Sequence, residues 1–330
     1  AHIVYASSWL KVHAPEHFYA AILASQPMGF YSPATLVQDA RRHGVRVVGP
    51  SVNDSLVDAS VQRVGEDEAG ESYRPGRPES LPVRGVVPLD VDRELAVRIG
   101  LSQVRGLGAA AERIVEARRR GAFTSQADLA RRAHVSASAM EKLAMAGALE
   151  CLGVGRREGA WAAGALAQPH ARSGQWQPFL PGTEVGSLVP ELPSLSEAER
   201  MRSDVDTTGL TPGKHPFSYV RAALPATTLR AGDLGQHLAG RIVDVAGVVT
   251  HRQRPHTGGG ITFLSLEDET GLVNVSVSVG AWKKFRRVCL ESNALLVRGT
   301  LEWGDGAINV QAFRIAPVKL PIDVRSRDFR

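Results

Sequence analysis

The chain has 330 residues, and its 39 Lys and Arg residues against 34 Asp and Glu residues give it a formal net charge of +5 at pH 7. A content of 43% hydrophobic and 22% charged residues is typical of a globular protein of two or three domains. No apolar run approaches the roughly 20 residues of a membrane helix, and the first residues lack the layout of a signal peptide. We therefore expect no membrane contact. Two cysteines are too few for a disulfide framework, which favours the reducing cytoplasm.

Helical spacing predicts three helices near the N-terminus, over residues 3–13, from Pro15 onward, and over residues 34–42. Gly44 is expected to end the third helix, and residues 45–48 to form a short strand. We expect this compact segment to extend to residue 53. Residues 54–88 are rich in Gly, Pro and charged side chains, a composition typical of an exposed linker.

Residues 89–152 are predicted to form an all-helical module that contains a helix-hairpin-helix. Its central feature is a tight Gly106-Leu107-Gly108 turn followed by an amphipathic helix. Glycines in such a turn let backbone amides at a helix N-terminus approach a phosphate, so we predict DNA contacts at Arg105, Gly106, Gly108 and Arg113. Two alternatives stay open: a plain turn without ligand, and a dinucleotide fingerprint, which requires a strand directly before the glycines.

Serines with an acidic residue three positions later predict the starts of two further helices, at Ser125 and at Ser138, and Gly147 is expected to end the second. Residues 153–239 read as a connector, within which a helix begins at Glu197. The pairs Asp90 with Asp92 and Asp204 with Asp206 have a spacing that can hold Mg²⁺. Their linker-like surroundings favour solvated or capping roles, so no catalytic and no metal-binding residue is predicted.

Residues 240–316 predict a five-stranded OB-fold barrel, with strands at 242–249, 261–266, 272–279, 295–301 and 308–312. A helix is expected at 282–290, and residues 317–330 form a C-terminal tail. In the third strand, alternation places Val273, Val275, Val277 and Val279 on one face. A polar turn precedes this strand, and its Gly271 is expected to need a positive φ. The predicted fold class is therefore α+β with several domains.

Basic residues beside the barrel point to a nucleic-acid partner. Arg252 and Arg254 are expected in the loop after the first strand, where they would neutralise phosphates without reading sequence. Lys283 and Lys284 extend this charge along the helix, although a solvated charge run is an equally simple explanation there. Phe263 has an aromatic ring that can stack on a base, unless it packs in the core.

Several stretches of the chain resemble the C-terminal third of the error-prone bacterial DNA polymerases, translesion relatives of the replicative polymerase III alpha subunit. The matching stretches are residues 4–11, 26–31, 38–44, 105–108, 208–212, 252–255, 262–271 and 326–329. The resemblance covers essentially the whole chain. It implies that residues 1–53 finish a fingers domain, that tandem helix-hairpin-helix elements at 89–152 meet the primer-template duplex, and that the OB-fold at 240–316 handles single-stranded template.

The same resemblance implies cytoplasmic translesion synthesis after DNA damage, with accessory mutasome proteins as partners and Mg²⁺ as the cofactor of the full-length polymerase. The catalytic aspartates of that family lie upstream of the matching region, so this chain is expected to bind no metal and to be inactive alone. An alternative from another functional class is a protein-interaction platform, in which the barrel docks an accessory subunit and does not contact DNA.

Overall fold

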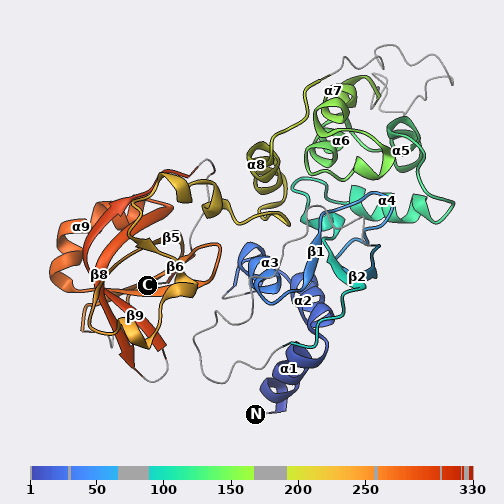
Figure 1. The fold of residues 1–330 in the computed structure, drawn as a ribbon. Coiled ribbons are helices and arrows are strands. Elements are labelled where there is room, and N and C mark those ends of the chain that lie inside the picture. Colours follow the sequence, from blue (N-terminus) through green and yellow to red (C-terminus); the bar gives the residue numbers. More distant parts are fainter. Residues whose placement is uncertain are drawn as a thin grey trace.

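The computed structural model describes residues 2–28, 31–65, 89–166, 192–255, 259–304, 307–320, 322 and 327–329. A helical body with the N-terminus and a β-barrel with the C-terminal strands lie side by side (Figure 1). Helix α8 (Glu197–Thr208) and the segment after it run from the first body to the second. Within these ranges, no helix combines the length and the hydropathy that a membrane span requires.

Three helices open the chain, as predicted. Two of them begin at a proline, whose fixed φ suits the first helical position. Ser32 caps the third by accepting a hydrogen bond from the backbone N–H of Thr35 at 3.2 Å. The helices are α1 (His2–His13), α2 (Pro15–Ala24) and α3 (Pro33–Arg42).

A three-stranded sheet packs against these helices. Its strands are β1 (Arg46–Val48), β2 (Ser60–Arg63) and β3 (Leu95–Arg98), with β3 central, parallel to β1 and antiparallel to β2. Only the first strand was predicted. The strand β2 lies within the expected linker and β3 within the expected all-helical module, so both expectations are wrong at these positions. Strands of four residues are too short to show a period in sequence.

The helix-hairpin-helix region forms one core, in which Ile114, Leu129, Met140 and Leu143 have no exposed surface. Ser125 caps its helix as predicted, whereas the cap of the next helix is Ser136 and not Ser138. The helices are α4 (Ala110–Arg118), α5 (Gln126–Ala133), α6 (Ala137–Met145) and α7 (Arg156–Leu166). The last of these lies in the expected connector, yet Ala163 of α7 is part of the same core.

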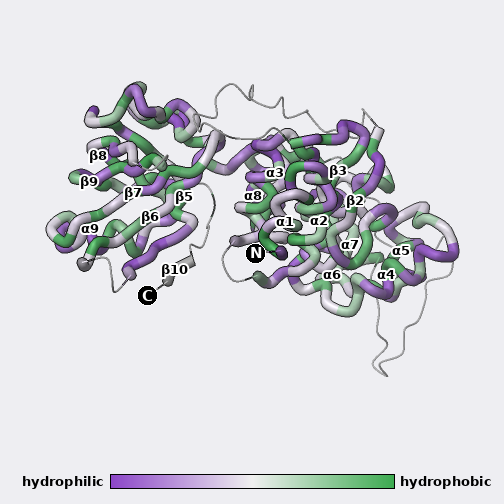
Figure 2. Tube along the Cα trace, turned by 90° about the horizontal axis from the view of Figure 1, so that it is seen from below, coloured by the Kyte–Doolittle hydropathy of each residue, from purple (hydrophilic) through white to green (hydrophobic). Residues whose placement is uncertain are grey.

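The barrel has the predicted order of three strands, a helix and two strands. It closes because β5 pairs with both β6 and β8, β7 runs parallel to β9, and β9 pairs with β8. The tube in Figure 2 changes between hydrophobic and hydrophilic residues along these strands, as expected for a barrel with one buried face. Its elements are β5 (Ile242–Gln253), β6 (Thr262–Glu267), β7 (Leu272–Val277), α9 (Val279–Glu291), β8 (Ala294–Gly304) and β9 (Ala307–Pro317), and β10 (Arg327–Phe329) pairs with the end of β5.

Two details of the barrel differ from the prediction. Gly271 has no positive φ, because the turn before β7 is built by Asp268, whose Oδ1 accepts hydrogen bonds from the backbone N–H groups of Thr270 at 2.7 Å and Gly271 at 3.0 Å. Val279 does not continue the buried face of Val273, Val275 and Val277. It begins α9, directly after its cap Ser278, and is 40% exposed.

Arg252 occupies an interior position and not a loop. Its side chain is 6% exposed, and it donates hydrogen bonds from Nε to the carbonyl of Cys289 at 2.6 Å and from a terminal nitrogen to the carbonyl of Ser292 at 2.7 Å. These carbonyls belong to the C-terminal end of α9, where a cation is favoured. Arg252 therefore fastens α9 to β5, and the expected loop position is wrong. Its contact with a phosphate stays a prediction, and these internal bonds use donors that the contact would need.

A buried ion pair joins the helical body to the barrel. Arg42 of α3 donates to Glu267, the last residue of β6, at 2.7 Å, and their side chains are 12% and 4% exposed. The hydroxyl of Thr35 also donates to Glu267, at 3.4 Å. Burial raises the pKa of Glu267, and Arg42 opposes that rise. Because a buried pair is costly to break on one side, this contact holds the two bodies together.

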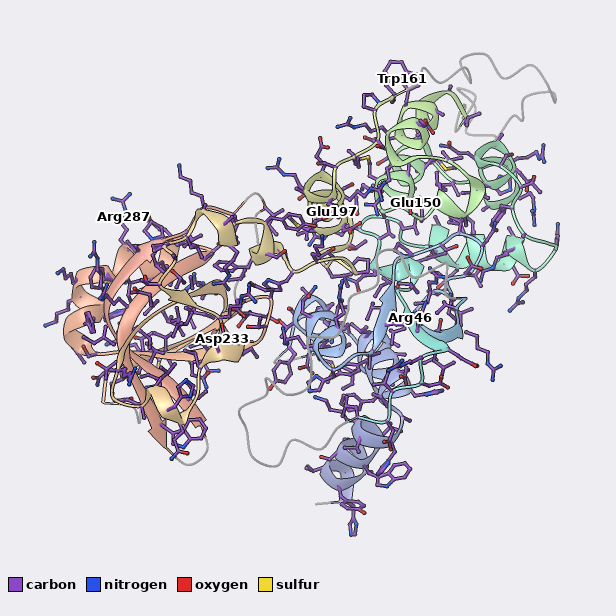
Figure 3. The ribbon with its side chains drawn as sticks, in the orientation of Figure 1. Arg46, Glu150, Trp161, Glu197, Asp233 and Arg287 are labelled. Carbon is purple, nitrogen blue, oxygen red and sulfur yellow. The ribbon has the colours of Figure 1, made fainter. Side chains whose placement is uncertain are left out.

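Replacing Glu267 with alanine is expected to lower the free energy of unfolding by about 3 kcal/mol, because it leaves the Arg42 guanidinium buried without its main partner. Urea unfolding followed by circular dichroism measures this. The matched control is Glu291→Ala, which removes an ion pair with Arg287 whose side chains are 64% and 87% exposed (Figure 3). The control should change stability by at most about 0.5 kcal/mol. Equal losses in both variants would contradict a structural role for the buried pair.

Replacing Arg252 with methionine is expected to cost about 2 kcal/mol of stability, because it leaves carbonyls at the end of α9 without donors. Arg254→Met should cost almost nothing, since Arg254 is exposed and forms no hydrogen bond or ion pair with the residues that the structure describes. Denaturant midpoints of the two variants decide the matter. An unchanged midpoint for Arg252→Met would make this arginine available for DNA again.

Candidate nucleic-acid interface

The glycine turn of the helical module has the backbone conformation that was predicted for it. Gly106 and Gly108 have φ angles of 76° and 51°, a region that glycine adopts without steric cost. Leu107 between them is buried and anchors the turn, and a Cβ on Gly108 would meet no atom within 4 Å. The segment Leu101–Gln103, shortly before the turn, forms a 3-10 helix. It is not the strand that a dinucleotide fingerprint requires. The open side of Gly108 leaves its backbone accessible to a ligand.

The two arginines predicted at this turn both hold neighbouring helices. Arg105 donates from its guanidinium to the carbonyl of Asp206, at 3.1 Å, near the end of α8. Arg113 donates to the carbonyl of Ala133, at 3.2 Å, at the end of α5. Both side chains also have exposed surface. Each arginine can still present part of its guanidinium to a phosphate, but part of its hydrogen-bonding capacity is used inside the protein.

The outward side of the barrel carries two rows of small and polar side chains around one aromatic ring. Strand register places Phe263 beside Gln253 on β5 and Ser276 on β7, and Ser276 beside Gln311 on β9. Phe263 is 38% exposed, so its ring is not part of the core. The second row lies one pair further along the same strands. It consists of His251, Ser265, Asn274 and Asn309. We call these eight residues the open face of the barrel. Ser276 is its one buried member, at 8% exposed, and it accepts a hydrogen bond from the amide of Asn309 at 2.9 Å.

The remaining predicted cations lie near this face or on α9. Arg254 follows β5 directly, and its guanidinium lies 3.9 Å from the position that a Cβ on Gly260 would take. Lys283 and Lys284 are exposed on α9, and the Lys284 ammonium lies 5.3 Å from the centre of the Phe285 ring. None of these three cations makes an ion pair with the described parts of the chain. They are free to meet an external anion.

One aromatic residue near the open face was not predicted as a site residue. Tyr31 is 54% exposed, and its ring lies edge-on to that of His251, with 6.2 Å between ring centres. It precedes Ser32, the cap of α3, so its position beside the barrel depends on the docking of α3. Sequence offers no signal for this contact, because 220 residues separate the two rings.

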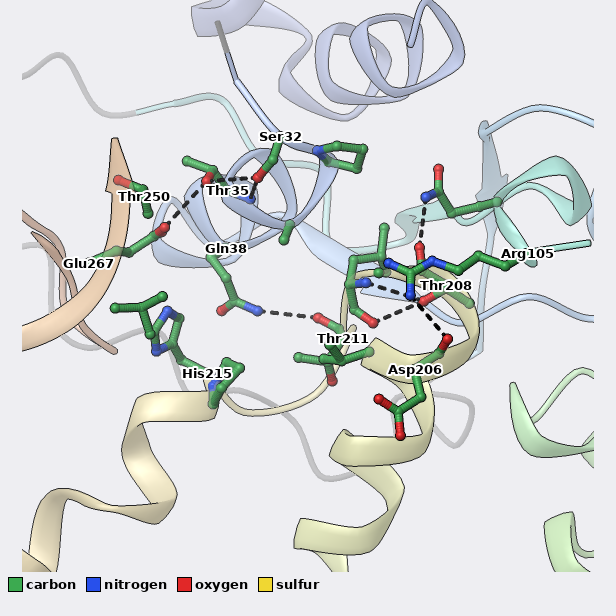
Figure 4. A pocket seen from close by; sticks show the side chains of 18 of the residues that line it. Ser32, Thr35, Gln38, Arg105, Asp206, Thr208, Thr211, His215, Thr250 and Glu267 are labelled. Atoms are coloured by element: carbon green, nitrogen blue, oxygen red, sulfur yellow. Dashed lines mark hydrogen bonds between the residues drawn. The ribbon is translucent and has the colours of Figure 1, made fainter. Parts of the chain in front are cut away.

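A cavity of about 770 Å³ lies where the helical body, the glycine turn and the barrel meet (Figure 4). Ser32, Gln38, Arg105 and Glu267 come from three separate parts of the chain and line it together. Most of its polar groups already bond to each other, as when Gln38 donates to the carbonyl of Thr211 at 3.2 Å. The hydrogen bonds drawn in Figure 4 brace the junction.

His215 borders the same cavity as a neutral side chain. Burial, with the nearby Arg42, Arg41 and Arg221, lowers the pKa of His215 to about 3. Its Nδ1 accepts a hydrogen bond from the backbone N–H of Phe217 at 3.1 Å, which requires an unprotonated nitrogen. This histidine therefore braces the segment between α8 and the barrel and contributes no positive charge to the interface.

One aspartate of each predicted pair has a structural partner. Asp90 pairs with His13 at 2.8 Å, and Asp204 is buried against Arg156 at 2.6 Å and Thr211 at 3.1 Å. Burial raises the pKa of Asp204, and Arg156 opposes that rise. Among the residues with described positions, no group of three or more His, Cys, Asp or Glu side chains is placed to hold a metal ion.

Comparison with protein families assigns both modules. A helix-hairpin-helix motif matches residues 44–159, and an OB-fold nucleic acid binding domain matches residues 243–318. Among solved structures, asparaginyl-tRNA synthetase from Pyrococcus horikoshii is 20% identical over 28% of this chain and 23% of that chain, with a TM-score of 0.25. That likeness is too weak to carry an argument.

Curated relatives match the entire chain. An error-prone DNA polymerase from Mycobacterium bovis is 44% identical over 333 residues, covering 100% of this chain and 27% of the relative. One from Cutibacterium acnes is 44% identical over 352 residues, covering 100% of this chain and 30% of the relative. The chain thus spans less than a third of the length of these relatives, and over that span it is a homologue of the error-prone DNA polymerases.

Proposed function

We propose that this chain is the C-terminal DNA-binding portion of an error-prone DNA polymerase that acts in damage-induced translesion synthesis and mutagenesis. The observation that carries the proposal is the similarity of the whole chain, at 44% identity, to polymerases of that name. The glycine turn and the open face, each with unpaired cations or exposed backbone nearby, support it. The polymerase would act in the cytoplasm, with DNA and accessory mutasome proteins as partners.

The helical module is proposed to hold the duplex part of a primer-template. Its turn at Gly106 and Gly108 presents backbone amides to a phosphate, and such contacts fix position without reading sequence. Arg105 and Arg113 contribute their remaining donors at the edge of this site. Because both arginines are already anchored on carbonyls, they lose little side-chain entropy when a phosphate arrives.

The barrel is proposed to hold the single-stranded template on its open face. Phe263 supplies a ring on which a base can stack, and the exposed side chains of Gln253, Asn274 and Gln311 around it supply hydrogen bonds to base edges. The face itself is nearly neutral, so phosphate contacts fall to its border, where Arg254 lies. Lys283 and Lys284 on α9 continue this basic border in the proposal.

Bond formation is assigned to another part of the polymerase. Asp90 is hydrogen-bonded to His13, and Asp204 is engaged in an ion pair with Arg156, as described above. The proposal therefore places nucleotidyl transfer, with its Mg²⁺, outside these residues and gives this chain the role of holding the substrate.

A second candidate function is docking of an accessory protein on the barrel. The observation that favours it is a set of large apolar side chains on the barrel surface with about half of their area exposed. Ile242, Leu272, Leu290 and Phe313 are 59%, 47%, 47% and 48% exposed. Exposed apolar side chains on a stable module are a feature of protein-binding surfaces when they form one patch.

Binding of labelled single-stranded DNA, measured by fluorescence anisotropy over a range of salt concentrations, separates the two functions. DNA binding predicts a linear fall of log affinity with log salt, and Arg254→Gln should reduce that slope by about 0.7 because one phosphate contact is lost. Phe263→Ala should weaken binding by about 1–3 kcal/mol and leave the slope unchanged, since stacking releases no counterions. Phe313→Ala, an exposed aromatic outside the open face, is the matched control. Affinity that does not respond to salt in any variant would favour the docking function.

Primer extension tests the division of labour. The purified chain, given primed template, nucleotides and Mg²⁺, is expected to add no nucleotide, because in this proposal it contains only substrate-holding parts. A complete error-prone polymerase on the same template serves as the positive control. Extension by the chain that survives further purification would refute the assignment of catalysis to other residues.

A further inference from the structure

The ammonium group of Lys142 lies against the glycine turn of the helical module. Lys142 is on α6, yet its side chain crosses to Gly106, 36 residues earlier in the sequence. A Cβ on Gly106 would overlap the Lys142 Nζ and would lie 3.6 Å from its Cε and 3.7 Å from its Cδ. The positive φ of Gly106 favours glycine, and a Cβ at this position would push the ammonium aside.

This ammonium has no internal partner among the described residues, unlike most arginines of the same module. Arg118 donates to the carbonyl of Val52 at 2.9 Å, and Arg131 and Arg132 both pair with Asp128 at 2.9 Å. The Lys142 Nζ forms no hydrogen bond or ion pair with any residue whose position is described. A cation of this kind is satisfied by water or by an external anion.

Each of the two hairpins of the module places a basic side chain at the turn of the other. Arg113 of α4 reaches the turn between α5 and α6, where it donates to the carbonyl of Ala133. Lys142 of α6 reaches the turn that precedes α4. The arginine closes the second turn by bonding to its carbonyls, whereas the lysine adds a positive charge to the first turn without bonding to it.

That charge is unfavourable in the protein alone. Helix α4 begins at Ala110, two residues after Gly108, and its N-terminal end carries partial positive charge. The N–H groups of Ala110 and Ala111 donate to the carbonyls of Leu107 at 3.0 Å and Gly108 at 3.1 Å, whereas the N–H groups of Gly106, Gly108 and Ala109 form no hydrogen bond with the described residues. The cap residue Ala109 has no side chain that accepts a hydrogen bond. A second positive group beside this end gains nothing from the helix, so the arrangement is stabilised only when an anion lies between the ammonium and the amides.

We propose that Lys142 and the backbone of the Gly106–Gly108 turn together form a binding site for one phosphodiester of duplex DNA. This inference rests on the proposed function and deepens it, because it assigns the charge of the hairpin site to a residue on a different helix. Arg105 and Arg113 then serve mainly to position the turn and its neighbour. Lys142 is a binding residue and has no part in bond formation.

Duplex binding by the full chain over a range of salt concentrations tests the proposal. Lys142→Gln is expected to reduce the slope of log affinity against log salt by about 0.9, which makes binding about eightfold weaker at about 0.1 M salt. Lys142→Arg should restore most of the slope, since it keeps the charge. Lys319→Gln, which removes an equal charge from the exposed segment after β9, is the matched control and should leave the slope unchanged.

A double-mutant cycle of duplex binding is a second test. Gly106→Ala should displace the ammonium and weaken duplex binding by itself, and adding Lys142→Gln to it should weaken binding no further. Additive losses would show that the two residues act separately and would overturn the inference. A lowered melting temperature of Lys142→Gln with an unchanged slope would also overturn it, by assigning the lysine to folding. Failure of the wild-type chain to bind duplex would instead remove the proposed function, whatever the variants do.

Discussion

The buried contact between Arg42 and Glu267 sets the geometry on which the other sites depend. It joins the last turn of α3 to the last residue of β6, two elements that are 225 residues apart in sequence. A carboxylate and a guanidinium lose their hydration when they are buried, so the pair is stable only with both partners present. That requirement fixes how the barrel approaches the helical body, and with it the positions of Tyr31 beside His251 and of the cavity between the modules.

Further polar contacts stabilise this junction. Lys11 and Tyr19 both donate to Asp39, at 3.1 Å and 2.7 Å, and Asp39 in turn lies 3.7 Å from Arg42. Although burial alone would raise it, the pKa of Asp39 is lowered by Lys11 and His43. The ionised carboxylate is therefore retained, and a chain of alternating charges runs from α1 to the barrel. Such a network is rigid because each charge depends on the next for its solvation.

The basic side chains of the chain fall into two groups that composition cannot separate. Arg105, Arg113 and Arg252 donate to main-chain carbonyls at the ends of helices, where a planar guanidinium can satisfy more than one acceptor. Arg254 and Lys142 have no such partner in the described structure. A net charge of +5 therefore says little about the strength of a phosphate-binding surface, because much of the positive charge completes the fold.

The sequence by itself determined the barrel, the three N-terminal helices and the glycine turn. Alternation such as Val273, Val275 and Val277 has a period that only a half-buried strand satisfies, and a Gly-Xaa-Gly turn needs backbone angles that other residues avoid. It also carried the similarity to error-prone polymerases, since that lies in local motifs. Such local patterns can be recognised in the sequence because the interactions that produce them involve residues close together in the chain.

Only the tertiary structure decided which of the predicted cations are exposed. Arg252 and Arg254 are two residues apart and look alike in sequence. Arg252 nevertheless bonds to the C-terminal end of α9, whereas Arg254 is exposed to solvent. The difference arises because α9, which lies further along the chain, packs beside Arg252. The strands β2 and β3 were missed because each needs a partner from a distant segment to exist. The contact of Lys142 with Gly106 was invisible for the same reason: it depends on how two hairpins pack, and no local pattern encodes a packing angle.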